Sequence, residues 1–248
     1  TTAGTGSETD SAGVITKEDT YEKAFIGAPS LYPSIAVVDP ELMLSVPAGF
    51  TAFQGFDALF HSIEGYIANG ANLMSDMYAL TAVENLAKYL PRAVKDGGDL
   101  EARTHVAFAN TLSGVVMCLT LITSEHGMEH ALSAYHPNLP HGAGLIMISR
   151  AYFSYFVRNH ACDERFIRLA RAMGMPEADK PEDFLTALVR LQEACGVVGL
   201  KMSDYGIAFD EAEKFMRNAR EVMGVMFTSD RVQMTDADIV RIYEESWR

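Results

Sequence analysis

The sequence predicts a mainly α-helical protein in which an all-helical domain follows a short strand-containing segment. From about residue 50 onward, apolar residues recur at helical spacing in one stretch after another. Residues 1–48 differ, because they carry short β-branched runs, at 13–16 and 34–39, between glycine, proline and aspartate residues. Long helices are disfavoured there by four prolines, Pro29, Pro33, Pro40 and Pro47. We therefore expect two short strands within 1–48 and a helical bundle over 49–248.

The helical region divides into segments that end at glycine, proline or capping residues. The first segment begins near Phe53 and ends near Gly70, and the second starts at Ser75 as its N-cap and ends at Pro91. The segment over 99–120 is apolar on nearly all sides, which favours a central position. The remaining helices are expected over 125–135, 142–158, 163–173, 181–195, 209–223 and 235–246.

Composition excludes several classes of protein. The chain has 248 residues, of which 48% are hydrophobic and 21% are charged, so it can bury a core and is not intrinsically disordered. Acidic residues outnumber basic ones 33 to 20, and the net charge of -13 argues against nucleic-acid and membrane-surface partners. Three cysteines without a CxxC pair fit a reducing compartment, and we expect a cytoplasmic protein.

The start of the chain indicates a longer parent protein. Thr1 is not an initiator methionine, and the first eight residues, TTAGTGSE, form a loop-like segment that begins in the middle of a motif. We therefore expect a truncated chain.

Histidines carry the strongest chemical signal. Four of the seven fall within sixteen residues, at His126, His130, His136 and His141. A fifth, His61, follows Asp57 by four residues, so a helix presents both side chains on one face. His126 and His130 form a second pair with the same spacing. Such pairs on separate helices are able to meet at a common point.

A single aspartate–histidine pair on a helix is more often a surface pair than a metal site, and a lone histidine on an apolar helix is usually a core residue. Here the neighbours of Asp57 are apolar, which places its carboxylate near the core, where it needs a partner. One carboxylate with several imidazoles suits Zn²⁺ or Fe²⁺ better than Ca²⁺ or Mg²⁺. Spacing alone leaves open which cluster histidines would join Asp57 and His61.

Five motifs occur in a fixed order along the first 145 residues. They are TTAGTGSE at 1–8, VDPEL at 38–42, VPAGFTAFQGFDALFHSIEGY at 46–66, GGDLEAR at 97–103 and EHGMEHALSAYHPNLPHGAG at 125–144. Together they closely resemble the iron-containing (group III) alcohol dehydrogenase family. In this family an N-terminal α/β domain binds NAD(P), and a dehydroquinate synthase-like helical domain holds the metal. The resemblance implies that residues 1–48 are a remnant of the nucleotide-binding domain.

The resemblance also implies roles for single residues. The expected metal ligands are Asp57, His61, His126 and His141. The second histidine of the HxxxH motif, His130, is expected near the substrate and the nicotinamide as a catalytic residue. The TTAGTGSE loop typically touches the cofactor, so the matching positions are Thr1, Thr2 and Thr5.

The implied activity is hydride transfer between a metal-bound alcohol and NAD or NADP, with Fe²⁺ or Zn²⁺ as the metal. The partner would be a small alcohol or aldehyde, the enzyme would associate as a homo-oligomer, and the truncated chain alone would be inactive. Two alternatives stay open: a hydrolase that activates water with the same cluster, and a helical metal-binding or interaction domain without catalysis. The sequence does not select the alcohol, Fe²⁺ over Zn²⁺, or NAD over NADP.

Overall fold

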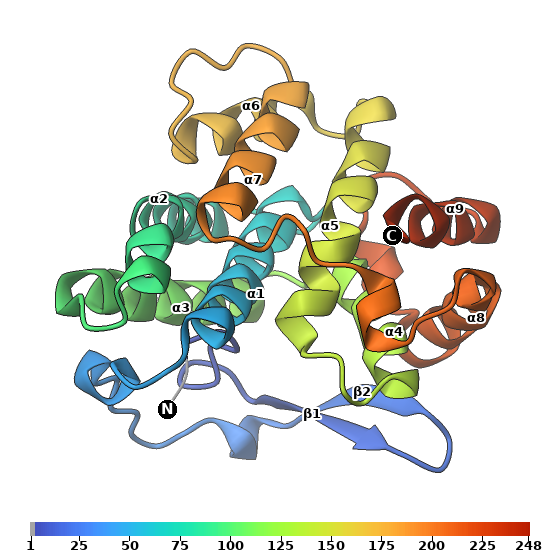
Figure 1. Ribbon diagram of the computed structural model, residues 1–248, viewed down its shortest axis with the longest axis horizontal. Coiled ribbons are helices and arrows are strands. Elements are labelled where there is room, and N and C mark those ends of the chain that lie inside the picture. Colours follow the sequence, from blue (N-terminus) through green and yellow to red (C-terminus); the bar gives the residue numbers. More distant parts are fainter. Residues whose placement is uncertain (1–2) are drawn as a thin grey trace.

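The computed structural model describes residues 3–248. Within these residues, nine α-helices pack around one large apolar core, and a two-stranded hairpin lies along one edge of the helical body (Figure 1). The expectation of a mainly α-helical protein is confirmed. Among these helices, none combines the length and the apolar character that crossing a membrane requires.

The helices follow the predicted segments closely. Their bounds are α1 (Ala48–Ile67), α2 (Leu73–Lys95), α3 (Leu100–Leu119), α4 (Glu125–Tyr135), α5 (His141–Arg158), α6 (Asp163–Ala172), α7 (Glu182–Ala194), α8 (Ala212–Met223) and α9 (Asp236–Ser246). Short 3-10 turns lie at Pro29–Leu31, Pro40–Met43, Met202–Tyr205, Phe209–Glu211 and Met226–Ser229.

The central helix is α1, which packs against α2, α3, α5 and α6. It buries 15 of its 20 residues. The prediction that the segment over 99–120 is central is wrong, because α3 buries only 10 of its 20 residues and leaves Phe108 46% exposed. The outer face of α3 is apolar but exposed to solvent. A helix that is hydrophobic on all sides therefore need not be buried on all sides.

Helix α2 differs from its prediction at both ends. Its N-cap is Asn72 rather than Ser75, and the two residues form a reciprocal capping box in which the Ser75 side chain accepts from the Asn72 backbone N–H. The helix also continues past Pro91 for another turn, although proline removes one backbone hydrogen bond. Leu90 and Ala93 are fully buried on either side of Pro91, and this packing supports the last turn.

Residues 12–27 form an antiparallel hairpin of β1 (Ala12–Lys17) and β2 (Glu22–Gly27), with Lys17 opposite Glu22. The strand predicted at 13–16 is confirmed, but the one predicted at 34–39 is wrong, and β2 was not predicted. Ile35 within that run is 84% exposed, and the described residues offer no partner strand to it. A β-branched run becomes a strand only where another strand pairs with it.

The hairpin lies along the base of α4 (Figure 1). The Tyr21 ring in its turn stacks on Tyr135 of α4, with 4.6 Å between ring centroids. Asn218 of α8 donates its side-chain amide to the Tyr21 carbonyl at 2.8 Å. These contacts hold β2 beside the histidines of α4. The domain boundary expected between 48 and 49 stays a prediction, and α1 begins at that point.

Candidate metal centre

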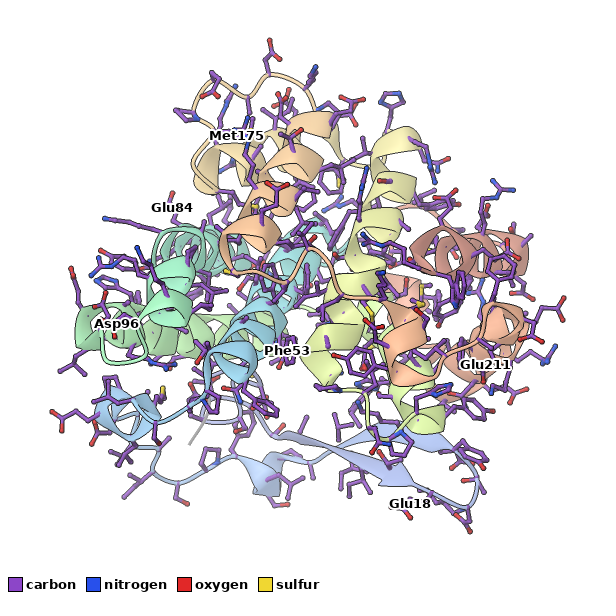
Figure 2. All side chains as sticks on the ribbon, viewed as in Figure 1. Glu18, Phe53, Glu84, Asp96, Met175 and Glu211 are labelled. Atoms are coloured by element: carbon purple, nitrogen blue, oxygen red, sulfur yellow. The ribbon has the colours of Figure 1, made fainter. Side chains whose placement is uncertain are left out.

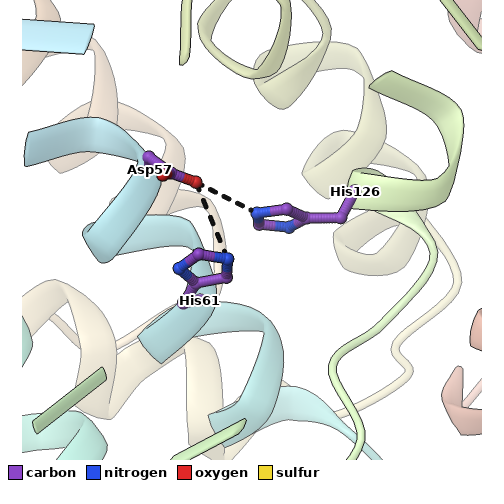
Figure 3. Close-up of side chains that lie close together, drawn as sticks. All are labelled: Asp57, His61 and His126. Atoms are coloured by element: carbon purple, nitrogen blue, oxygen red, sulfur yellow. Dashed lines mark hydrogen bonds and ion pairs between the residues drawn. The ribbon is translucent and has the colours of Figure 1, made fainter. Parts of the chain in front are cut away.

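Asp57 and His61 lie on the same face of α1, at the middle of the molecule. The His61 Nε2 atom is 3.6 Å from the Asp57 Oδ1 atom (Figure 3). Both side chains are buried. The four-residue spacing in the sequence therefore has the expected effect: it directs one carboxylate oxygen and one imidazole nitrogen to a common point.

His126 reaches the same point from α4. Its Nε2 atom is 3.3 Å from Asp57 Oδ1 (Figure 3), and its ring stacks on that of His61, with centroids 4.3 Å apart. One donor atom from each of the three residues lies within 4.8 Å of the other two. Three side chains from two helices thus form a compact group of nitrogen and oxygen donors.

His141, the first residue of α5, adds a third imidazole. Its Nε2 atom is 3.5 Å from the same Asp57 oxygen. A tetrahedral ion with ligands at 2.0–2.1 Å has ligand–ligand edges of about 3.4 Å, and the three distances to Asp57 are close to that value. The group of donors that all lie within 4.8 Å of one another holds Asp57, His61 and His126, whereas His141 belongs to a neighbouring group with Glu129 and His130. The side chain of His141 is 28% exposed, against 7% for Asp57. The candidate centre therefore opens toward solvent on the side of His141.

A glycine allows α5 to approach α1 closely enough for this contact. A Cβ atom placed on Gly142 would lie 2.1 Å from the backbone oxygen of Phe53. Phe53, labelled in Figure 2, sits on α1 one turn before Asp57. Because backbone atoms of the two helices touch here, only a residue without a side chain fits. The Gly of the PHG motif therefore places its His.

Two further carboxylates lie behind the histidines. Glu64 of α1 bonds the Nδ1 atom of His126, and Glu129 of α4 bonds the Nδ1 atom of His141. Both glutamates are fully buried. A carboxylate on one ring nitrogen fixes the proton there and leaves the other nitrogen free to bind a metal, which is the usual environment of metal-binding histidines.

The electrostatics favour a bound cation. Burial lowers the pKa of His126, but Glu64 and Asp57 outweigh burial and raise the pKa to about 10. The pKa of His141 is raised in the same way, chiefly by Glu129. Burial opposes ionisation of Asp57, yet the histidines hold its pKa well below the usual range. The carboxylates that raise the pKa values of these two imidazoles make the site electrostatically negative. The same negative charge stabilises a bound divalent cation.

His61 supplies the neutral imidazole of the group. Burial lowers its pKa to about 3, although Asp57 acts in the opposite direction. The ring is therefore unprotonated on one nitrogen at neutral pH, the form in which histidine binds metals. The donor set and its charge thus fit Zn²⁺ or Fe²⁺.

His130 lies beside this group rather than in it. Its Nδ1 atom is 3.1 Å from the carbonyl oxygen of Lys23, which only accepts, so Nδ1 carries the proton and Nε2 has the free lone pair. Burial keeps the pKa of His130 well below its usual value. Its ring centroid is 5.4 Å from that of His141. His136 bonds Glu211 instead, at 3.0 Å.

The N-terminal loop reaches the centre through Gly4. A Cβ atom on Gly4 would lie 3.0 Å from Asp57 Oδ2, so the backbone of the loop covers one side of that carboxylate. Thr5, expected to contact the cofactor, is exposed next to it. The other two residues expected to do so, Thr1 and Thr2, lie outside the described residues.

Three residues of the site were assigned no role from the sequence: Glu64, Glu129 and Lys23. Helical spacing places Glu64 near His61 and Glu129 near His126, which indicates that both lie close to the site. It does not indicate their partners, because Glu64 bonds His126 and Glu129 bonds His141. Lys23 contacts α4 from 106 residues away, and no local pattern indicates such a contact.

Comparisons with known proteins identify the family of this chain. The model of the Fe-containing alcohol dehydrogenase family, C-terminal, matches residues 51–247. The NAD-dependent methanol dehydrogenase of Bacillus methanolicus is 32% identical over 235 residues, which are 89% of this chain and 58% of that protein. The 1,3-propanediol dehydrogenase of Klebsiella pneumoniae is 32% identical over 217 residues, 83% of this chain and 55% of that protein. The chain thus spans little more than half the length of these relatives.

Solved structures share the fold. An archaeal halo-thermophilic alcohol dehydrogenase from a Red Sea brine pool, bound to NZQ, superposes with a TM-score of 0.94 at 28% identity, covering 99% of this chain and 62% of that one. A 1,3-propanediol oxidoreductase superposes with a TM-score of 0.91 at 29% identity, covering 100% of this chain and 64% of that one. Together with the family match over most of its length, these likenesses show that the chain belongs to the Fe-containing alcohol dehydrogenase family.

Proposed function

We propose that this chain is the metal-holding part of an NAD(P)-dependent alcohol dehydrogenase, with Asp57, His61, His126 and His141 as the ligands of Fe²⁺ or Zn²⁺. The observation that carries the proposal is the convergence of three imidazole Nε2 atoms, at 3.3–3.6 Å, on one oxygen of Asp57. Relatives named for methanol and for 1,3-propanediol support a small alcohol or its aldehyde as substrate.

The metal, when bound, supplies a Lewis acid for the substrate oxygen. The chain's own residues would position the substrate and accept its proton. His141, the most exposed of the proposed ligands, marks the side from which substrate enters. The Nδ1 atom of His130 donates to the Lys23 carbonyl, so its Nε2 atom has the free lone pair, and we assign His130 the role of accepting the proton of the reacting alcohol. Its pKa lies well below the usual value, so the ring would pass this proton on to solvent rather than keep it. A bound nicotinamide would supply the hydride acceptor for this reaction.

The nucleotide would lie on the side of the N-terminal loop. Thr5 is exposed beside Gly4, which packs on Asp57, so a nicotinamide held by Thr1, Thr2 and Thr5 would lie next to the metal. This role suits residues 1–48 as a remnant of a nucleotide-binding domain ahead of the metal-holding domain over 49–248. The choice between NAD and NADP, the homo-oligomeric state and a cytoplasmic location stay predictions of the same proposal.

The proposal is tested with Asp57→Asn and, as a control, Asp179→Asn on the exposed surface of the full chain. We expect Asp57→Asn to lose metal affinity by more than the roughly 10–100-fold that outer contacts usually contribute. Asp179→Asn should bind like the unaltered chain. Metal content is measured by elemental analysis after dialysis, and affinity by competition with a chelator.

Activity separates the remaining candidates. Metal-dependent formation of NADH or NADPH from methanol or 1,3-propanediol supports the dehydrogenase. Metal-dependent hydrolysis of a nitrophenyl ester without nucleotide would instead support a hydrolase, which no comparison favours. Because the chain spans little more than half the length of its dehydrogenase relatives, metal binding with neither reaction is also the result expected of the metal-holding part by itself. Binding of NAD or NADP, measured by titration calorimetry, then separates that part from an inactive helical domain. Retention of metal by Asp57→Asn would overturn the ligand assignment itself.

A further inference from the structure

We propose that Glu129 is a positioning residue of the metal centre: it holds the His141 ring with Nε2 toward Asp57, and Lys23 of the hairpin holds Glu129 in place. This inference rests on the proposed function, because it concerns the orientation of a proposed ligand. Four observations carry it, and they come from α4, α5 and β2.

The first observation is the contact between Glu129 and His141. The Glu129 Oε2 atom bonds His141 Nδ1, while His141 Nε2 lies 3.5 Å from Asp57 Oδ1. The two nitrogens of one ring are therefore divided between two carboxylates. A ring held at Nδ1 by a buried acceptor carries its proton there, and its other nitrogen faces the metal in the deprotonated form that binding needs.

The second observation is that the structure makes room for Glu129. A Cβ atom on Gly144 would lie 2.7 Å from both Cγ and Oε1 of Glu129. The glutamate therefore lies flat against the bare backbone of α5, one turn after His141. Its side chain is fully buried, so it has few alternative positions, and the contact with His141 is fixed by packing.

The third observation is the placement of Lys23. Its Nζ atom is 3.4 Å from Glu129 Oε2, 2.7 Å from Ser133 Oγ and 3.4 Å from His141 Nδ1. The Lys23 side chain is only 14% exposed. A buried carboxylate without a compensating charge is costly, and the ammonium removes that cost. The backbone carbonyl of Lys23 also contacts the site, because it accepts a hydrogen bond from His130 Nδ1 at 3.1 Å.

The fourth observation concerns an alternative role for Glu129, that of a ligand of a second cation. Donor atoms of Glu129, His130 and His141 lie within 4.8 Å of one another, so these residues are themselves a candidate cation site. The Lys23 ammonium, however, already contacts two members of that group, Glu129 and His141, and the Lys23 carbonyl accepts a hydrogen bond from Nδ1 of the third, His130. The Lys23 ammonium thus supplies the positive charge that a second cation would bring to this group. Glu129 therefore orients His141 and is not itself a metal ligand.

The test compares Glu129→Gln with Glu125→Gln in the full chain. Glu125 lies one turn earlier on α4 and is equally buried, and neither of its oxygens has a hydrogen-bond partner within residues 3–248. We expect Glu129→Gln to weaken Zn²⁺ binding about 10–100-fold, and Glu125→Gln to leave it within about threefold. The visible absorption spectrum of the Co²⁺-loaded chain, which reports ligand geometry, should change only in Glu129→Gln.

Lys23 is tested through its coupling to Glu129. Lys23→Met should lower the urea midpoint of unfolding in the unaltered chain, because it leaves Glu129 uncompensated, and should change it little in the Glu129→Gln background. Equal shifts in both backgrounds would show that Lys23 does not act through Glu129 and would overturn that part of the proposal.

The outcomes distinguish this inference from the proposed function. If the unaltered chain binds one Zn²⁺ that Asp57→Asn loses, and Glu129→Gln keeps normal affinity and a normal Co²⁺ spectrum, the positioning role is wrong and the metal centre stands. Two Zn²⁺ per unaltered chain, one of them lost in Glu129→Gln, would also overturn it, because Glu129 would then be a ligand. A chain that binds no metal refutes the proposed function as well.

Discussion

At the residue scale, buried carboxyl groups set the properties of this protein. Asp57 and Glu129 face protonated or protonatable nitrogens, and their pKa values are held down. Asp230, which lies behind the candidate metal centre, has no such partner within residues 3–248. It accepts from the backbone N–H and the hydroxyl of Ser124, at 3.0 and 2.7 Å, and from the Tyr152 hydroxyl at 3.4 Å. Hydrogen bonds from these neutral donors lower the pKa of Asp230 by less than burial raises it.

Burial raises the pKa of Asp230 to about 7 from its ordinary value of 3.8. Between about pH 4 and pH 7 the folded chain therefore holds a proton that the unfolded chain releases, and the stability supplied by this group is lost as the pH rises through that window. The full effect of such a shift is roughly 4 kcal/mol. Asparagine at position 230 does not ionise, so Asp230→Asn lacks this pH-dependent contribution. We expect the variant to be no more stable than the unaltered chain at pH 5, and we expect the difference in the free energy of unfolding to shift in favour of the variant at pH 8.

Urea unfolding of both chains at the two pH values measures this difference. Because every other group is shared, the pH dependence of the difference belongs to Asp230. Parallel stability curves from pH 5 to pH 8 would show that Asp230 is ionised in the folded state at pH 5 and that the assignment is wrong.

The site residues differ in how far the sequence reveals them. The spacing of Asp57 and His61 predicts that they share a helix face, as they do. Spacing leaves open which histidines join them, and only the resemblance to a known family singles out His126 and His141. The approach of these histidines to one oxygen of Asp57 is not predictable, because it depends on how closely α1, α4 and α5 approach one another. That approach is decided by packing between residues tens of positions apart, and a local pattern holds no information about it.

At the element scale, helices were easier to predict than strands. The bounds of α4 and α6–α9 lie within a few residues of those expected, because apolar periodicity and capping residues act locally. The strand expected at 34–39 failed because a strand depends on a partner. The early end expected at Pro91 failed because packing of the last turn of α2 outweighs the missing hydrogen bond.

The crossing of α5 over α1 gives a prediction at this scale. Gly142→Ala places a methyl group on the Phe53 backbone oxygen, which cannot move without displacing α1. We expect a loss of about 1–3 kcal/mol in the free energy of unfolding, together with weaker Zn²⁺ binding, because His141 moves away from Asp57. Urea unfolding and chelator competition measure the two effects.

Gly49→Ala is the matched control for this substitution. Gly49 lies in the first turn of α1 and is exposed, and a Cβ atom added there would meet no other atom within 4 Å. Alanine there should raise the free energy of unfolding by about 0.5–1 kcal/mol and leave Zn²⁺ binding unchanged. A Gly142→Ala chain with unaltered metal affinity would show that the close crossing does not place His141.

At the scale of the whole molecule, the N-terminal segment is an added layer held to the helical body at a few points. The backbone N–H of Gly6 donates to the Asn110 side chain at 3.1 Å, and Glu8 accepts from Asn110 and Thr111 of α3 at 2.9 and 2.7 Å. Beyond this loop, the hairpin is held by Tyr21 and Lys23 on α4 and α8. The candidate metal centre lies under both attachments, so its cover depends on elements far from it in sequence.

Gly114 is the point at which this layer comes closest to α3. A Cβ atom there would lie 2.1 Å from Thr9 Oγ1 and 2.5 Å from the Gly6 carbonyl oxygen. Gly114→Ala should therefore lift residues 3–9 from α3, although alanine favours the helix itself. Because Gly4 covers Asp57, we also expect weaker Zn²⁺ binding.

Hydrogen exchange followed by mass spectrometry checks this expectation on the whole chain. Amides in residues 3–9 should exchange faster in Gly114→Ala, while those of α1 and α2 keep their rates, because the helical core does not depend on the loop. Gly49→Ala, with the same chemical change in open space, should show neither effect. Faster exchange throughout the helices would mean that the N-terminal layer and the helical body unfold as one unit, and unchanged exchange in the loop would mean that its contact with α3 does not hold it in place.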